Sequence, residues 1–452
     1  MSDAASPRCA RRVRSERGFA LLALLCVAVV MGPACTRKEP APDAKPDVVL
    51  IVVDTLRADH LPLWGYERDT APNLTRFARD AVVYENAISP GTWTVPSHGS
   101  ILTGRWPSYH GAQRVPGDKI LAMPLNPSVP TLAELLQARG WNTVAFIGNS
   151  TYLDALFGFH RGFGEYVTGN FWHANHVYGR IVDWLAKHPE PSFVLWNAID
   201  PHEPYDPPPP FDARFPGRRP EHGVMLSELV WQGTKPTDEM IAHFVSQYDA
   251  EIAVADDAIG KVLDALREQG RYERALIVVT SDHGELFGEH GMYSHGTPPF
   301  EPMVHVPLIV KYPGDRRAGE RVARRVSTAA IFATILRELG VPTPEGTNVP
   351  SLDEPHDVWV EDIDQKGERV LVGYAGDHKV VRRAAEAGTY TFVYDLARDP
   401  GEEKPLDDPR AAAELRASLE AFAAAPRPAN LADVPVIDAE HEAKLRALGY
   451  VR

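Results

Sequence analysis

Four short apolar runs, rich in β-branched residues, constrain the fold of this chain more than any other feature. The first is Val48–Val53, and the others occupy residues 143–147, 193–196 and 275–279. None of these runs alternates apolar with polar residues, as a strand with one face in water would. Each run is therefore typical of a parallel β-strand that is buried on both faces.

Helical patterns lie between and after these runs. Thr131 and Glu134 form the pattern of a capping box, and the helix that follows should end near Gly140. Residues 240–269 are amphipathic, and residues 411–424, rich in Ala, Leu and Glu, predict a further helix. Strands that alternate with helices predict an α/β fold with a central, mostly parallel sheet between helices.

Polar residues follow the predicted strands at the point where each strand ends. Asp54 follows the first strand, Asp200 and His202 follow the third, and Asp282 with His283 follows the fourth. Because the carboxyl ends of parallel strands form one edge of a sheet, we expect these side chains to gather there. A single aspartate after a strand is usually a helix cap, but three such ends with carboxylates and imidazoles favour a divalent metal site.

The N-terminus carries the pattern of an export signal. Five arginines within residues 8–17 precede an apolar run, Phe19–Met31, which is long enough for a signal-peptide core and short for a membrane span. Cys35 follows as in a bacterial lipoprotein signal, where it would be lipidated, although the two residues before it depart from that pattern. An uncleaved anchor is the alternative. We expect residues 1–35 to form the signal and residues 36–46, polar and proline-rich, to form a linker.

Composition excludes several partners for the body of the chain. The three cysteines are Cys9, Cys26 and Cys35, so none remains after the signal for a disulfide or a thiolate metal site. The formal net charge is −14, which argues against nucleic acid as a partner. We expect contact with a membrane only through an N-terminal lipid or signal anchor. The protein would then be exported, and either periplasmic or attached to a bacterial outer membrane.

The stretch Thr94–Gly104 resembles the signature of the sulfatases, C-x-P-S-R followed by x-S-x-L-T-G. Its proline, serines, leucine, threonine and glycine are in place, whereas Thr94 replaces the cysteine and His98 replaces the arginine. Further segments resemble sulfatase motifs in the same order along the chain: Pro46–Leu61, Asp200–Tyr205, Ser281–Glu285, Gly288–Gly291, Val306–Val310, Tyr394–Glu402 and Leu448–Tyr450. The chain is therefore identified as a member of the sulfatase family within the alkaline-phosphatase superfamily.

This resemblance implies a domain organisation. It predicts an alkaline-phosphatase-like core, with the mostly parallel sheet between helices, and a small C-terminal α+β subdomain. We place the sulfatase-like catalytic domain at residues 47–352 and the C-terminal subdomain at residues 353–452.

The departures from the sulfatase pattern favour phosphate chemistry. A sulfatase oxidises its cysteine, or a serine, to formylglycine, and threonine has no place in that route, so we expect no formylglycine here. The combination of Asp54, Thr94, Asp282 and His283 instead resembles that of nucleotide phosphodiesterases and phosphoethanolamine transferases. Asn149 lies where sulfatases carry the lysine of a G-K-W-H element, and it resembles the phosphate-contacting asparagine of the phosphodiesterases.

The resemblance assigns a role to each candidate residue. Thr94 is the expected nucleophile. The expected ligands of a first metal ion, which also contacts the oxygen of Thr94, are Asp54, Asp282 and His283. The residues that complete a second metal site or contact the substrate are Asp200, His202 and His295. Two residues are expected to contact the ester group: Asn149 and His98. We expect one or two divalent ions, with zinc favoured and manganese or calcium as alternatives.

These assignments predict a metal-dependent hydrolase of phosphate or sulfate esters, acting on a small molecule, a glycan or a lipid. Attack by Thr94 would form a covalent intermediate, which water or an acceptor alcohol then releases. Two alternatives stay open. One is a phospho-group transferase that acts on envelope lipid or glycan, and the other is a non-catalytic binding protein in which Thr94 only caps a helix.

Overall fold

The computed structural model describes residues 45–447, apart from residues 116–117, 119–120, 170–171, 297, 365 and 409. The predicted signal at residues 1–35, nearly all of the predicted linker and the motif Leu448–Tyr450 lie outside the described residues. Export and lipidation of Cys35 therefore stay predictions. Within the described part of the chain, no helix has the length and apolar character that crossing a membrane requires.

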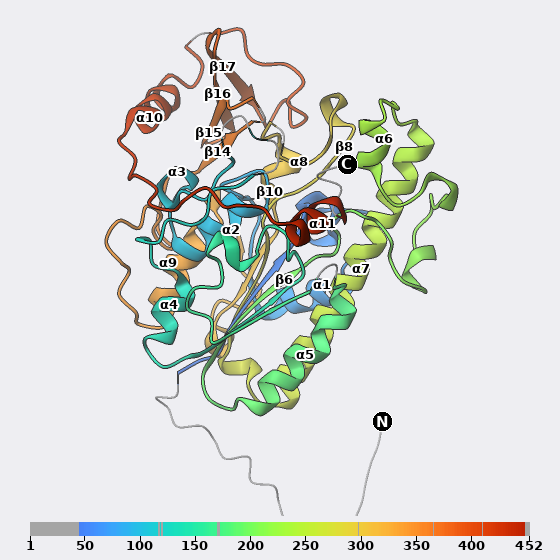
Figure 1. Ribbon diagram of the computed structural model, residues 1–452, viewed down its shortest axis with the longest axis vertical. Helices are drawn as coiled ribbons and strands as arrows, with labels where there is room; N and C mark the ends of the chain where they lie inside the picture. The colour runs from blue at the N-terminus through green and yellow to red at the C-terminus, as the bar shows by residue number, and fades with distance from the viewer. Residues whose placement is uncertain are drawn as a thin grey trace, which may run out of the picture. The chain divides into compact units, whose positions relative to one another are not determined.

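An eight-stranded sheet forms the centre of the protein (Figure 1). In spatial order its strands are β12 (Arg321–Val322), β2 (Val82–Tyr84), β11 (Leu308–Lys311), β7 (Leu276–Ser281), β1 (Val48–Val53), β6 (Ser192–Ala198), β4 (Asn142–Ile147) and β5 (Glu165–Thr168). The five strands from β7 to β5 are parallel to one another, and β11 runs antiparallel to both of its neighbours. All four predicted strands lie in the parallel part, which confirms the mostly parallel sheet.

Both faces of this sheet are covered, which explains why its strands are apolar throughout. The side chains of Val48, Leu50 and Val52 join one hydrophobic cluster, together with residues of α2 (Thr94–Thr103), α4 (Leu132–Gln137) and α9 (Ala330–Glu338). The alternate residues of β1 join a second cluster, together with residues of α1 (Pro72–Phe77), α5 (Ala174–Lys187) and α7 (Asp238–Glu268). Figure 1 shows α4 and α9 on one side of the sheet and α5 and α7 on the other. Parallel strands covered in this way carry no polar alternation.

The helices begin and end as follows: α1 (Pro72–Phe77), α2 (Thr94–Thr103), α3 (Pro107–His110), α4 (Leu132–Gln137), α5 (Ala174–Lys187), α6 (Leu226–Trp231), α7 (Asp238–Glu268), α8 (Glu301–Val304), α9 (Ala330–Glu338), α10 (Ala413–Ala424) and α11 (Ala439–Ala447). The capping box before α4 is present, because Thr131 Oγ1 accepts from Glu134 N at 3.2 Å and Glu134 Oε2 accepts from Thr131 N at 2.8 Å. The predicted helices at 240–269 and 411–424 correspond to α7 and α10.

An antiparallel sheet follows the main sheet in the sequence. Its strands are β14 (Trp359–Ile363), β15 (Arg369–Ala375), β16 (His378–Ala385) and β17 (Gly388–Asp395). Leu415 and Leu419 of α10 are buried in the same cluster as Trp359 and Leu371 of this sheet. The predicted fold class, an α/β core with a C-terminal α+β part, is therefore confirmed. The described residues form one compact unit, so the boundary at residue 352 stays a prediction.

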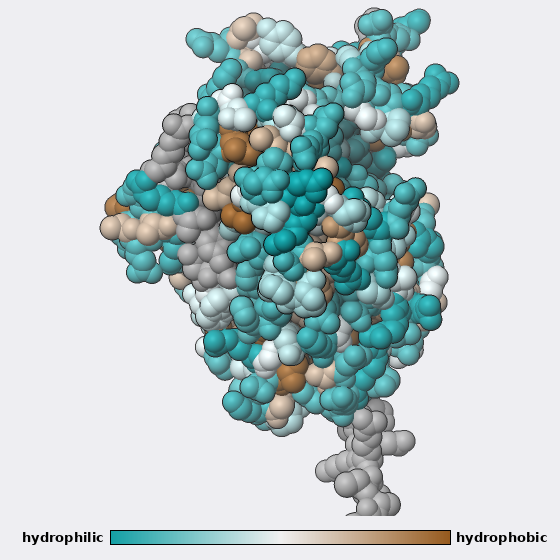
Figure 2. Space-filling view, turned by 90° about the vertical axis from the view of Figure 1, so that its right-hand side faces the viewer, coloured by the Kyte–Doolittle hydropathy of each residue, from teal (hydrophilic) through white to brown (hydrophobic). Residues whose placement is uncertain are grey.

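Two small sheets complete the fold. They consist of β10 (His305–Val306), β3 (Ala87–Ile88) and β13 (Val326–Ser327), and of β8 (Leu286–Phe287) with β9 (Tyr293–Ser294). The face drawn in Figure 2 is mostly hydrophilic, with apolar residues scattered singly or in small groups. Such scattered exposure is ordinary for a protein surface, so this face gives no sign of a large apolar docking area.

Candidate active site

Thr94 begins a buried helix beside the carboxyl edge of the central sheet. The residue before it, Trp93, has extended backbone and supplies no side-chain cap to α2. Thr94 is fully buried, and its Oγ1 accepts a hydrogen bond from Nδ2 of Asn149 at 3.3 Å. Its hydroxyl is thus not used to cap the helix. The first turn of α2 also contains Pro96, a residue that suits a helix start.

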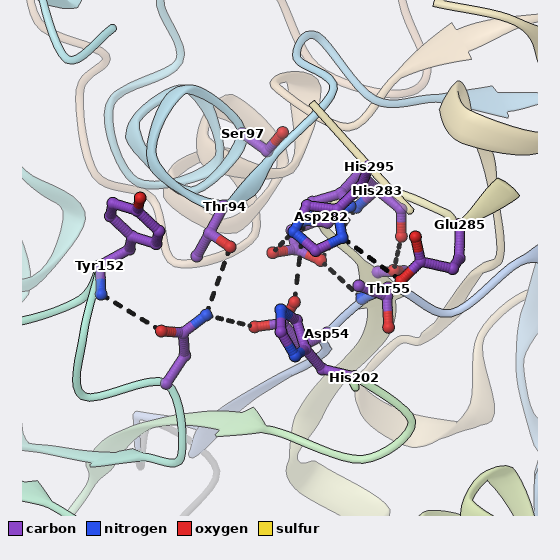
Figure 3. Close-up of polar contacts among 12 residues, drawn as sticks. Asp54, Thr55, Thr94, Ser97, Tyr152, His202, Asp282, His283, Glu285 and His295 are labelled. Atoms are coloured by element: carbon purple, nitrogen blue, oxygen red, sulfur yellow. Dashed lines mark hydrogen bonds and ion pairs between the residues drawn. The ribbon is translucent and has the colours of Figure 1, made fainter. Parts of the chain in front are cut away.

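Asp54, Asp282 and His283 lie together at the ends of two neighbouring strands. Asp54 follows β1 and the other two follow β7, and the last residues of these strands, Val53 and Ser281, are paired in the sheet. One ligand atom from each of the three side chains lies within 4.8 Å of the other two. Nε2 of His283 is 3.7 Å from Oδ1 of Asp54 and 3.5 Å from Oδ2 of Asp282. Figure 3 shows Thr94 facing this group.

Three buried atoms of this group have no hydrogen-bond partner: Asp54 Oδ1, Asp282 Oδ2 and His283 Nε2. The remaining polar atoms of the same side chains are satisfied. Nδ2 of Asn149 donates to Asp54 Oδ2 at 3.0 Å, the backbone N–H of His283 donates to Asp282 Oδ1, and His283 Nδ1 donates to the carbonyl of Gly284. Buried polar atoms nearly always have a partner. Two carboxylate oxygens and an imidazole nitrogen that converge without one fit a divalent cation.

The charges of the group agree with this fit. Burial, and then the neighbouring Asp54 carboxylate, raise the pKa of Asp282 well above its usual range. Burial also lowers the pKa of His283 far below its usual range, so this imidazole is neutral, as a metal ligand requires. Both shifts arise because charge is buried here without a counter-charge. A divalent cation held by these residues would supply that counter-charge.

The two residues predicted to contact the ester group also lie in this site. Asn149 follows β4, and its side-chain amide bridges Asp54 and Thr94 through the two hydrogen bonds given above. Nδ1 of His98 donates to the carbonyl of Thr94 at 3.0 Å and is 3.4 Å from Oδ2 of Asp282, and its Nε2 has no partner. Burial lowers the pKa of His98 to about 4, so the ring is neutral near pH 7.

His202 and His295 lie beside His283, whereas Asp200 contacts the start of α5. The ring centroids are 5.0 Å apart for His202 and His295, and 4.8 Å apart for His283 and His295. Oδ2 of Asp200 instead accepts from the backbone N–H of Ala174 at 2.6 Å, and its Oδ1 accepts from His173. The expectation that Asp200, His202 and His295 complete a second metal site or contact the substrate stays a prediction, although Asp200 is already bound to the start of α5.

Two residues of the site, Asn197 and Glu285, were not predicted from the sequence. Asn197 lies inside β6, where it donates to Asp54 Oδ2 at 3.4 Å and accepts from the backbone N–H of Asn149 at 2.8 Å. Its signal in the sequence was a polar residue inside an apolar strand. Glu285 accepts from Nδ1 of His295 and from the hydroxyl of Tyr205, both at 3.3 Å. Glu285 belongs to the segment Ser281–Glu285, which resembles a sulfatase motif, but the sequence assigned it no role.

Comparisons with known proteins place the chain in a family. A family model described as Sulfatase matches residues 46–341, more than half of the chain. The chain is 24% identical over 425 residues to the ulvan-active sulfatase of Formosa agariphila, a match that covers 80% of this chain and 77% of that protein. It is 27% identical over 287 residues to the uncharacterized sulfatase YidJ of Escherichia coli, and spans 55% of that protein's length and 56% of its own.

A solved structure shows the same fold. The phosphonate monoester hydrolase of Agrobacterium radiobacter superposes with a TM-score of 0.66 at 20% identity, covering 90% of this chain and 96% of that one. At this identity the likeness concerns the fold alone. The family match confirms the resemblance drawn from the sequence motifs. The chain belongs to the sulfatase family.

Proposed function

We propose that this protein is a metal-dependent hydrolase of phosphate or sulfate esters in which Thr94 is the nucleophile. One observation carries the proposal. The amide of Asn149 joins the hydroxyl of Thr94 to Asp54, beside three buried ligand atoms that have no hydrogen-bond partner. A hydroxyl held beside such a group has the surroundings in which an alcohol can attack an ester.

Asp54, Asp282 and His283 would hold the cation, with Thr94 beside it. The chemistry that a divalent cation supplies in such a site is positive charge, which lowers the pKa of a neighbouring alcohol and neutralises charge on the transferring group. Two buried carboxylates and one neutral imidazole suit zinc or manganese better than calcium, which prefers oxygen ligands alone.

The side chains around Thr94 would orient and stabilise it. In the attack, Oγ1 of Thr94 bonds to the phosphorus or sulfur atom, the bond from that atom to the ester oxygen breaks, and the proton of the hydroxyl ends on the departing alcohol. Water then attacks the same atom, the bond to Oγ1 breaks, and Thr94 regains a proton from that water. The N–H of Asn149 that donates to Oγ1 stabilises the negative charge that develops on this atom. The first turn of α2 adds the positive end of a helix dipole at the same place. We assign His202 and His295, beside His283, to contacts with the ester.

The charge of the site favours an ester group that carries one negative charge. Among the residues that the structure describes, no Lys or Arg side chain contacts Asp54, Thr94 or Asp282. With one divalent cation, the two carboxylates leave no surplus positive charge for a phosphate monoester dianion. Phosphodiesters and sulfate monoesters both carry a single charge. We choose the phosphodiester, because the residues at positions 94 and 149 resemble those of phosphodiesterases.

The test is a comparison of three chromogenic esters with the purified protein: bis(p-nitrophenyl) phosphate, p-nitrophenyl phosphate and p-nitrophenyl sulfate. We expect the diester to react fastest, EDTA to stop turnover, and added zinc or manganese to restore it. Asp282→Asn should lose the metal, whereas Asp256→Asn, a buried carboxylate on α7 outside the site, should retain it.

Other outcomes have definite meanings. If the sulfate ester reacts faster than both phosphates, or if activity survives complete removal of metal, the proposal is wrong. Release that is faster in the presence of an acceptor alcohol than in water would favour the transferase. A metal-loaded protein that turns over none of the three esters would favour a binding protein.

A further inference from the structure

A second cluster of potential metal ligands lies outside the site described above. It consists of His173, Asp200 and Glu251, with one ligand atom from each within 4.8 Å of the other two. The three residues come from separate parts of the chain. His173 immediately precedes α5, Asp200 follows β6, and Glu251 lies in the middle of the long helix α7.

The cluster has one unsatisfied atom, and it belongs to Glu251. This residue is 1% exposed, its Oε1 accepts from the backbone N–H of Asp206 at 2.8 Å, and its Oε2 has no hydrogen-bond partner. A buried carboxylate oxygen without a donor is costly, because the charge loses its water and gains nothing in return. The unsatisfied atom therefore indicates that a positively charged partner belongs at this place.

The protein itself supplies too little positive charge to the cluster. His173 can balance Asp200, to which it is hydrogen-bonded, but Glu251 forms no ion pair with any described residue. Burial, and then the nearby Asp200 carboxylate, raise the pKa of Glu251 well above its usual range, and the Asp206 carboxylate raises it further. Within the cluster, two carboxylates therefore lie beside one imidazole, and both of them, those of Asp200 and Glu251, are 1% exposed.

We propose that His173, Asp200 and Glu251 bind a second divalent cation, separate from the one at Asp54, Asp282 and His283. The donor set of one imidazole and two carboxylates suits zinc or manganese. A route of entry exists, because the side chain of His173 is 27% exposed while the other two are buried.

The second cation has a structural role that reaches the active site. It joins the start of α5, the middle of α7 and the segment after β6, and His202 lies only two residues beyond Asp200. The ring of His202 packs against that of His295, which packs against His283. The cation therefore fixes the segment that carries His202, and it takes no part in bond breaking.

Metal counting on variants tests this inference. EDTA first removes bound metal, zinc is then added, and excess zinc is removed. Inductively coupled plasma mass spectrometry then gives the number of zinc ions per chain. We expect two ions per chain in the wild type, and one fewer in both His173→Ala and Glu251→Gln. His176→Ala is the matched control, because His176 is an exposed histidine in the first turn of α5 whose ring centroid is 6.2 Å from that of His173. It should keep both ions.

The two cation sites are counted separately. Asp54→Asn should lose the other ion and keep the one at His173, so failure of one site does not hide the other. His173 is partly exposed, so His173→Ala should fold even if Glu251→Gln does not, and circular dichroism checks this. Equal metal content in the wild type, His173→Ala and Glu251→Gln would overturn the inference. A single ion that is lost only in Asp54→Asn would overturn it as well.

Discussion

Replacing Thr94 by alanine should remove catalysis while removing little stability. Two contributions to stability are lost. One is the hydrogen bond from Asn149, which at 3.3 Å is long and contributes about 1 kcal/mol. The other is the contact of one buried methyl group, which contributes about 0.8 kcal/mol. We therefore expect Thr94→Ala to lower the free energy of unfolding by about 1–2 kcal/mol.

The expected loss of activity is much larger than this loss of stability. Without the hydroxyl no covalent intermediate can form, and kcat should fall by at least about 10³-fold, which corresponds to about 4 kcal/mol in the barrier. Thr94→Ser keeps the hydroxyl and should keep measurable turnover. A purely structural role would instead predict that activity falls only in proportion to the fraction unfolded.

Thr103→Ala provides the matched control. Thr103 lies at the other end of α2, is 1% exposed, and its Oγ1 donates to the carbonyl of Gly99 at 2.6 Å. The variant loses the same atoms as Thr94→Ala, and we expect a similar loss of stability with activity retained. The assay pairs initial rates on bis(p-nitrophenyl) phosphate with urea unfolding in the same metal-containing buffer. Wild-type turnover by Thr94→Ala would make water the attacking group and refute the assignment.

Three further perturbations follow from the structure. Asn149→Ala removes the donor to Thr94, and kcat on the diester should fall about 10²-fold. The side chain also loses its hydrogen bonds with Asp54 and Tyr152, so urea unfolding should show a loss of about 1–3 kcal/mol. Arg271→Ala leaves Asp47 buried without its partner, so urea unfolding should show a loss of about 3–5 kcal/mol; an unchanged midpoint would contradict this. Burial raises the pKa of Asp256 to about 6, so its stabilising contribution is complete below about pH 4 and is lost as pH rises through 6. The free energy of unfolding of the wild type should therefore fall relative to that of Asp256→Asn as pH rises from 4 to 7, measured by the same urea unfolding assay.

The parallel strands could be predicted because their burial is visible in the sequence. All six residues of Val48–Val53 are apolar, and all six are buried, three against the helices on each face. The strands on the other side of β7 were not predicted. Arg321–Val322 and Val82–Tyr84 are too short to show a pattern, and only their neighbours in the sheet make them strands.

The first metal cluster could be predicted for a similar reason. Asp54 and Asp282 are far apart in the sequence, but each follows a buried parallel strand, and such strands end at a common edge. Asn197 could not be found in this way. It lies within β6, paired with Val52, whereas the predicted strand ended at residue 196, one position before it. A polar residue fully buried within a parallel strand needs a partner, and here that partner is the active site.

The position of an aspartate after a strand does not show whether its carboxylate binds a metal or the start of a helix, and Asp200 is an example. The first N–H groups of a helix need acceptors, and α5 begins where Asp200 can accept from Ala174. Ala174 lies 26 residues before Asp200 in the sequence, so no local sequence pattern predicts the contact. Asp54 differs because the amides of Asn149 and Asn197 both donate to one of its oxygens and leave the other free. A carboxylate is marked as a metal ligand by an oxygen that no donor reaches, which is a property of tertiary structure. By that criterion the second cluster is marked by Glu251, which an amphipathic pattern alone would assign to the interior of a helix.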